Sequence, residues 1–279
     1  MKPVAFQYER ARSLDEASSL LAQDGVFSKA VAGSQSLGPM LNLRLAQPDL
    51  LVDITSIPEL TAVTENSDAI EIGACITHAD IEDRRVPDVS RGLLPEVAGR
   101  IAYRAVRNRG TIGGSLAHSD PAADWVSVFP LMDAEVLIWS RRGNRALAAG
   151  ELMVSSFTTT LQPDELIRAI RVPKFSSSAR WGFYKFSQTA GEFAHAIGAV
   201  LHDPELKKFR AVIGAIETAP IVVPDAAQIF GGPFGSDLAS RLDRGAVLNL
   251  LDGSGVTDDY NRKLLIVALE RAARQACAS

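Results

Sequence analysis

The chain has 279 residues, of which 47% are hydrophobic and 22% charged, proportions that are ordinary for a soluble globular protein. The formal net charge of −4 disfavours a nucleic-acid binder, because neutralising phosphates requires a surplus of Lys and Arg. No window approaches about 18 uninterrupted apolar residues and the first residues lack the apolar core of a signal peptide, so we expect a cytoplasmic protein without a transmembrane segment.

The first third of the chain predicts alternating strands and helices. Val4, Phe6 and Tyr8 alternate with polar residues, as in a strand, and Ser13 with Glu16 forms a capping box for a helix that runs to about Gln23. Further on we expect a strand over residues 29–32, a helix over residues 37–45 and a strand over residues 50–54. The order is therefore β-α-β-α-β.

The middle of the chain mixes the two element types. The apolar patterns predict strands over residues 69–76, 134–139 and 165–172, helices over residues 94–103 and 125–132, a helix cap at Thr77 and a hairpin turn over residues 141–145. The polar, serine-rich residues 174–179 follow Pro173 and indicate a domain boundary.

The last hundred residues predict a second, smaller domain. Strands are expected over residues 183–186, 211–216 and 247–250, and a periodic helix over residues 258–276. The pattern as a whole favours a two-domain α+β protein.

Two loops of small residues are candidates for binding a phosphate. One runs from Ala32 to Gly38 after a predicted strand, and the other runs from Gly110 to Ser115. Glycine lets backbone N–H groups approach a pyrophosphate closely, although each loop taken alone also fits a tight turn. Pro39 stands where a P-loop needs Lys, and GxGxxG does not occur, so the loops indicate a dinucleotide held by a different fold.

The inventory of catalytic residues is poor. None of the four histidines belongs to an HExxH pattern, GxSxG is absent, and each histidine is interpreted as an ordinary surface or loop residue. Cys75 and Cys277 are two distant, reduced thiols, so any iron–sulfur cluster must belong to another chain. Asp120 and Asp124 fit a helix start, with ribose binding by Asp124 as the alternative. The chemistry therefore belongs to a bound cofactor.

Together the two loops resemble the motifs of a known family. Ala32-Gly33-Ser34-Gln35-Ser36 is similar to the AGGxS loop of the FAD-binding medium subunits of molybdenum hydroxylases, the family of xanthine dehydrogenase and carbon monoxide dehydrogenase. Thr111-Ile112-Gly113-Gly114 matches the TIGG motif, and the DPAAD string from Asp120 follows it. Gly191-Glu192-Phe193-Ala194 resembles the G-D-[FY]-A segment. Ser34, Glu192 and Phe193 depart from the commoner Gly, Asp and Tyr.

The resemblance implies a fold. Residues 1–175 would form a two-lobed FAD-binding domain of the vanillyl-alcohol-oxidase-like type, with lobes at about residues 1–55 and 56–175. Residues 179–279 would form a small C-terminal α+β domain with a three-stranded antiparallel sheet. FAD would lie extended between the lobes and this domain.

The resemblance also implies the cofactor-binding residues. Asp124 would lie on the adenosine side, Ile101 and Ile167 would line the pocket, Lys185 would lie near the N1–C2 end of the flavin, and Phe193 would place its ring against it. An outward-facing strand charge is the alternative for Lys185. The pyrophosphate would be held by the backbone N–H groups of Val31, Ala32, Gly33, Ser34, Gln35, Ser36, Leu37 and Gly38, and of Thr111, Ile112, Gly113, Gly114 and Ser115.

The implied function is electron transfer. FAD would be bound non-covalently, with molybdopterin on a large partner subunit and [2Fe-2S] clusters on a small one, in a heterotrimer. Electrons would leave the flavin for NAD, a quinone or another acceptor. No catalytic residue or metal is expected in this chain. Two alternatives remain: a self-sufficient flavin oxidoreductase of the vanillyl-alcohol-oxidase type, and a structural subunit without a cofactor.

Overall fold

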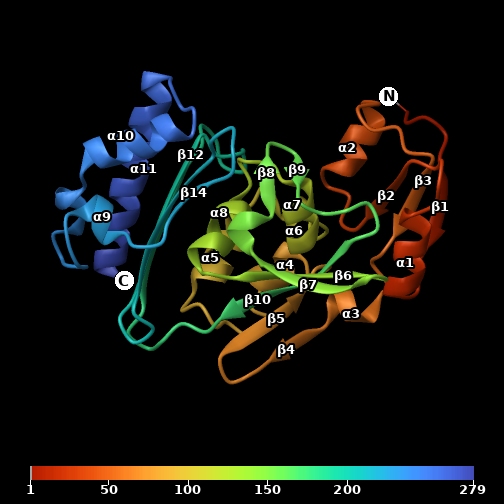
Figure 1. The fold of residues 1–279 in the computed structure, drawn as a ribbon, viewed down its shortest axis with the longest axis horizontal. Coiled ribbons are helices and arrows are strands. Elements are labelled where there is room, and N and C mark those ends of the chain that lie inside the picture. Colours follow the sequence, from red (N-terminus) through yellow and green to blue (C-terminus); the bar gives the residue numbers. More distant parts are fainter. Residues whose placement is uncertain (1) are drawn as a thin grey trace.

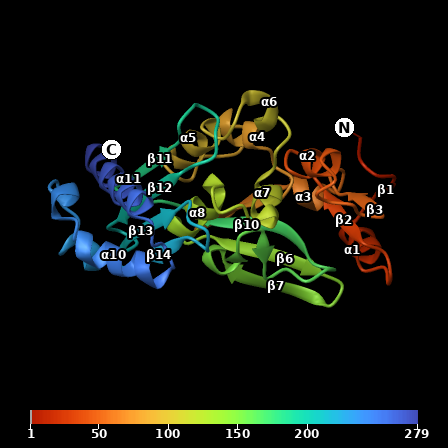
Figure 2. The ribbon, with the colours of Figure 1, turned by 90° about the horizontal axis from the view of Figure 1, so that it is seen from above.

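The computed structural model describes residues 2–279, which form three units in a row, each built around its own β-sheet (Figure 1). The N-terminal unit, coloured red to orange, and the C-terminal unit, coloured teal to blue, lie at opposite ends of the molecule. Figure 2 shows the same row from above. Within the described residues no helix is long and apolar enough to cross a membrane.

The N-terminal unit has the expected β-α-β-α-β order. Its elements are β1 (Gln7–Arg10), α1 (Leu14–Leu21), β2 (Ser28–Val31), α2 (Leu37–Asn42) and β3 (Leu50–Asp53). The three strands are parallel in the order β1-β3-β2.

Some boundaries in this unit differ from the prediction. Ser13 caps α1 by accepting from the Glu16 N–H as predicted, whereas the Glu16 carboxylate accepts from the N–H of Arg12 rather than from Ser13. The first strand begins at Gln7, so Val4 and Phe6 lie outside it. Helix α2 stops at Asn42 because Arg44 has a left-handed backbone, with φ 59°.

The central unit is a five-stranded antiparallel sheet in the order β4-β5-β10-β6-β7. Helices α4 to α8 lie over one of its faces (Figure 1). The expected helix over residues 94–103 ends at Gly99, and a separate short helix begins after Tyr103. The elements are α3 (Pro58–Thr61), β4 (Val63–Glu65), β5 (Ala69–Gly73), α4 (His78–Glu82), α5 (Leu93–Gly99), α6 (Arg104–Arg107), α7 (Ile112–His118), α8 (Asp124–Leu131), β6 (Glu135–Ser140), β7 (Gly143–Ala148), η1 (Ala149–Glu151), β8 (Met153–Ser155), β9 (Thr158–Thr159) and β10 (Leu166–Pro173).

The C-terminal unit corrects the expected three-stranded sheet to four strands, in the antiparallel order β11-β12-β13-β14. Residues 247–250, expected as a strand, lie in helix α10, which Asp243 caps by accepting from the Ala246 N–H. The elements are β11 (Arg180–Phe186), β12 (Ala196–Asp203), β13 (Lys208–Gly214), β14 (Ile221–Val223), α9 (Ala227–Phe230), η2 (Leu238–Arg241), α10 (Arg244–Gly253) and α11 (Asp259–Ala278).

Strand β12 is buried on both faces of this sheet. Ile197 and Ala199 pack into the central core, whereas Ala196 and Val200 pack against α11. Burial on both faces replaces the alternating pattern of a half-exposed strand with a continuous apolar run. The sheet therefore joins the central unit to α11. Because β12 lacks alternation, no strand was predicted over residues 196–203.

Helix α11 lies so close to the sheet that side chains are excluded at the crossing. A Cβ on Gly182 would lie 1.9 Å from the carbonyl oxygen of Ala272. We expect Gly182→Ala to lower the free energy of unfolding by at least about 3 kcal/mol, because backbone on both sides cannot move aside. Gly253→Ala is the control, since nothing lies within 4 Å of its Cβ position. Equal urea midpoints for the two variants would contradict this packing.

Candidate cofactor site

The two small-residue loops lie against each other. A Cβ on Gly33 would lie 1.9 Å from the carbonyl oxygen of Arg109 and 2.8 Å from the Cα of Gly110. The first loop therefore packs directly on the beginning of the second. Gly33 is required by this contact within the chain, whether or not a ligand is near.

The first loop presents a run of free backbone donors. The structure gives no hydrogen bond within residues 2–279 for the N–H groups from Gly33 to Leu37, whereas Gly38 donates to the carbonyl of Ser34. Ser34 has φ 60°, the left-handed conformation in which the related motif has glycine. Successive N–H groups around such a residue form a concave anion site.

The second loop has already used most of its donors. The N–H of Ile112 donates to the carbonyl of Ile76, and that of Gly113 to the carbonyl of Ala74. Gly114 donates to the hydroxyl of Thr111, and Ser115 to its carbonyl. Of the N–H groups from Thr111 to Ser115 that were expected to hold a pyrophosphate, only that of Thr111 has no hydrogen bond within residues 2–279. What remains on the partly exposed side of this loop is the hydroxyl of Ser115.

His78 connects the second loop to the next helix. Its N–H donates to the carbonyl of Gly110 at 2.9 Å, and its Nδ1 accepts from the indole N–H of Trp125 at 3.1 Å. Only 5% of His78 is exposed, so its interpretation as a surface or loop residue was wrong. Burial, followed by the nearby charge of Arg107, lowers the pKa of His78 to about 4. The imidazole is therefore neutral, and the backbone N–H of His78 holds the loop in place.

A buried ion pair lies between the central and C-terminal units. Lys185 Nζ of β11 donates to Asp124 Oδ2 of α8 at 2.9 Å, and the two side chains are 8% and 5% exposed. Burial raises the pKa of Asp124, although Lys185 opposes this shift. Asp124 Oδ1 is buried and has no hydrogen-bond partner in the described chain. Such an oxygen is costly unless a further group donates to it.

This pair changes the expected arrangement of the cofactor. Asp124 and Lys185 were expected at opposite ends of an extended FAD, and the structure places them in one contact. At most one of the two positions holds. The outward-facing alternative for Lys185 is also wrong, because its side chain is buried. Asp124 lies in the first turn of α8 as predicted, but the helix begins there instead of just after Asp120.

The other expected residues differ in exposure. Ile101 precedes α6 and is partly buried, and Ile167 is buried in β10. Phe193 is 63% exposed, in the connection between β11 and β12. Val31 ends β2, Leu37 begins α2, and the remaining expected residues of the first loop (Ala32, Gln35, Ser36) lie partly buried between them.

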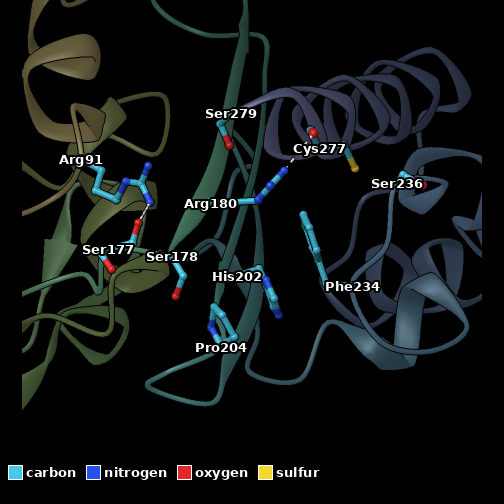
Figure 3. A pocket seen from close by; sticks show the side chains of 10 residues that line it. All are labelled: Arg91, Ser177, Ser178, Arg180, His202, Pro204, Phe234, Ser236, Cys277 and Ser279. Carbon is cyan, nitrogen blue, oxygen red and sulfur yellow. Dashed lines mark hydrogen bonds between the residues drawn. The ribbon is translucent and has the colours of Figure 1, made fainter.

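A cavity of about 630 Å³ lies away from these residues (Figure 3). It is lined by Arg91, Ser177, Ser178, Arg180, His202, Pro204, Phe234, Ser236, Cys277 and Ser279. None of these side chains belongs to the expected cofactor set. Within residues 2–279 no three His, Cys, Asp or Glu side chains gather as a metal site requires, and Cys75 and Cys277 are free thiols.

The fold and the site define a class of protein. The site offers free backbone donors, a neutral buried histidine and a buried ion pair, and none of these groups is an activated nucleophile. These are the properties of a domain that carries a non-covalent cofactor.

The comparisons identify the family. Residues 4–175 match the family described as the FAD binding domain in molybdopterin dehydrogenase. The chain is 32% identical to the caffeine dehydrogenase subunit beta of Pseudomonas sp., over 99% of this chain and 96% of the relative. It is 40% identical to the 6-hydroxypseudooxynicotine dehydrogenase complex subunit alpha of Paenarthrobacter nicotinovorans, over 78% of this chain and 76% of the relative.

A solved structure agrees with the sequence comparisons. A chain of carbon monoxide dehydrogenase from Hydrogenophaga pseudoflava superposes with a TM-score of 0.87 at 30% identity, covering 100% of this chain and 99% of that one. The protein therefore belongs to the FAD-binding subunits of the molybdenum hydroxylases, as the resemblance of its two loops predicts. It is an oxidoreductase subunit.

The buried imidazole makes stability depend on pH. The pKa of His78 falls from 6.5 to about 4 on folding, so its contribution is complete above pH 6.5 and is lost as the pH falls towards 4. In His78→Asn the Asn Oδ1 can replace Nδ1 as the acceptor for Trp125. Between pH 7 and pH 4.5 we expect the free energy of unfolding to fall by about 2 kcal/mol less in this variant than in the native chain. Urea unfolding at both pH values measures the difference. The same loss in both proteins would contradict the buried neutral imidazole.

Proposed function

We propose that this chain binds FAD without a covalent bond and passes electrons from iron–sulfur clusters of a partner subunit to an external acceptor. The observation that carries the proposal is the run of free N–H groups from Gly33 to Leu37, directly beside the second motif loop. Five neutral donors in sequence fit a pyrophosphate, which no carboxylate of this loop opposes.

The pyrophosphate would lie on the first loop. The second loop would contribute its shape and the Ser115 hydroxyl, while its other N–H groups hold Thr111 and the segment after β5 in place. The anion site would extend from Val31, at the end of β2, to Gly38 in α2. His78 would act indirectly, by fixing Gly110.

The ion pair would lie at the pyrimidine edge of the flavin. That edge presents an N–H donor between two carbonyl acceptors. Lys185 donates one of its three N–H groups to Asp124 Oδ2, and Asp124 Oδ1 lacks a donor. A cation beside N1 and C2 and a carboxylate beside N3 would match this pattern, so we assign Asp124 to the flavin instead of the adenosine. Ile101 and Phe193 would cover the ring, and Ile167 would support it from β10.

The complex would be a heterotrimer in the cytoplasm. The large subunit would carry molybdopterin and hydroxylate the substrate, and the small subunit would carry [2Fe-2S] clusters. FAD supplies the exchange of electrons with an acceptor such as NAD or a quinone. The match over nearly the full length of the caffeine dehydrogenase subunit supports a subunit in preference to a self-sufficient oxidase. The first two units would be the lobes of a vanillyl-alcohol-oxidase-like domain.

An absorbance spectrum of the purified chain tests the cofactor. We expect flavin bands at about 370 and 450 nm that move to the supernatant on acid precipitation, with FAD identified there by mass, because the protein only binds and tunes the cofactor. Added FAD should restore the bands to a chain purified without it. A folded, colourless protein that takes up no FAD would refute the proposal and leave the structural-subunit alternative.

Removing the lysine should expose the cost of the buried carboxylate. We expect Lys185→Met to lower the free energy of unfolding by about 3–5 kcal/mol, because Asp124 is left buried without its cation. Adding Asp124→Asn should recover most of this loss. Lys174→Met is the matched control, since its ion pair with Glu65 is partly exposed and should cost no more than about 1 kcal/mol.

The same variants report on the flavin. In the FAD-loaded protein, the midpoint potential should be more negative in Lys185→Met than in Lys174→Met, because the first loses the cation that stabilises the reduced, anionic ring. Denaturation by urea and a dye-coupled reductive titration are the two measurements. Additive losses in the double variant would argue against the ion pair, and equal potentials would argue against its place beside the flavin.

A further inference from the structure

Two exposed aromatic side chains lie beside the proposed flavin site on different units. Tyr103 caps α6 of the central unit and is 64% exposed, and Phe193 is 63% exposed in the β11–β12 connection. The link between them is Gly191, whose Cβ position would lie 2.9 Å from Cε1 and 3.1 Å from Cζ of Tyr103. The backbone of the connection therefore rests on the tyrosine ring, two residues before Phe193.

Two observations favour glycine at this contact. Gly191 has φ 86°, a conformation that L side chains rarely adopt, and a Cβ there would require the tyrosine ring or the connection to shift. The two requirements are independent, since the first concerns the backbone of the connection and the second concerns the tyrosine. Gly191 is therefore favoured both by its backbone conformation and by its contact with Tyr103.

Tyr103 stands on a rigid base. Arg107 donates to the carbonyls of Ile101 and Ala102 at 3.0 Å each and to the carboxylate of Glu82. Arg104 binds Glu82 and Asp83. The backbone on both sides of Tyr103 is therefore fixed to α4, which sets where its ring can meet Gly191.

The connection has few other attachments. Its hydrogen bonds given by the structure are internal: Thr189 N–H to the Glu192 carboxylate, Glu192 N–H to the Thr189 carbonyl, and Ser187 hydroxyl to the same carbonyl. At its root Ala194 is buried in the central core. Its tip at Gly191 lies on Tyr103. A segment with so few contacts opens at low free energy unless its tip is held.

We infer that Tyr103 is a positioning residue that holds the connection of residues 187–194 over the flavin, through the Tyr103–Gly191 contact. It thereby sets the place of Phe193 and limits the access of external molecules to the reduced ring. The inference rests on the proposed function, because it takes the flavin to lie between Lys185 and Phe193. An electron acceptor must pass or displace this connection, so the contact governs how fast small oxidants reach the cofactor.

The test compares Tyr103→Ala with Tyr103→Phe in the full chain. Phenylalanine keeps the ring under Gly191 and should behave as the native protein. Gly191→Ala should behave as Tyr103→Ala, since it breaks the same contact from the other side. Tyr260→Ala is the matched control, because Tyr260 is an equally exposed aromatic residue, 63%, on α11 of the C-terminal unit.

Three readouts separate positioning from simple destabilisation. Amide hydrogen exchange in residues 187–194 should accelerate by about tenfold in Tyr103→Ala while exchange in the core strands stays the same. In the FAD-loaded protein, quenching of flavin fluorescence by iodide should increase severalfold. Dithionite-reduced flavin should also transfer two electrons to dioxygen severalfold faster, forming hydrogen peroxide with one proton from the flavin and one from the solvent.

The outcomes are distinct. Faster exchange, stronger quenching and faster reoxidation in both contact-breaking variants, with none in Tyr103→Phe or Tyr260→Ala, would support the inference. Unchanged quenching in a Tyr103→Ala protein that retains FAD would overturn it, whatever the exchange rate. A native chain that takes up no FAD would overturn the proposed function and this inference together, and that failure is seen before any variant is compared.

Discussion

The burial of one carboxylate constrains much of this molecule. Asp124 begins α8 in the central unit, and Lys185 reaches it from β11 of the C-terminal unit. Removing two charges from water costs free energy. The attraction within the pair offsets that cost only while the two units keep the positions that bring the charges into contact. The remaining oxygen of Asp124 has no donor in the described chain, so the protein alone does not complete this pair. A flavin with an N–H at its pyrimidine edge would supply the missing donor.

The two motif loops have similar compositions but differ in which of their backbone N–H groups are free. Both are rich in glycine, yet Gly33 and Gly113 are needed because backbone or side chains of the same protein lie where a Cβ would be. The second loop donates four of its N–H groups to Thr111, Ala74 and Ile76 of the same protein, whereas the first leaves five free. Glycine in such a motif is therefore weak evidence for a ligand by itself, and the state of the N–H groups is the stronger evidence.

Several residues around the site fix the position of the loops and segments that form it. His78 fixes the second loop and touches Trp125 beside Asp124, and the arginines of α6 fix the segment that carries Ile101 and Tyr103. These residues hold geometry and carry no chemistry of their own. Such an arrangement suits a subunit whose reactivity belongs to its cofactor, because small shifts of the surroundings alter the exposure and the potential of a flavin.

The sequence by itself determined the β-α-β-α-β opening, the cap at Ser13, the long C-terminal helix and the family, because these rest on local periodicity, short-range hydrogen bonds and contiguous motifs. Only the tertiary structure decided the fourth strand of the last sheet, the burial of His78 and the Asp124–Lys185 pair. Strand β12 is apolar on both faces, and residues 247–250 are leucine-rich, so periodicity could not separate strand from helix in either. The ion pair joins residues 61 positions apart, and which faces meet depends on how the packed sheets and helices exclude water, which no local pattern encodes.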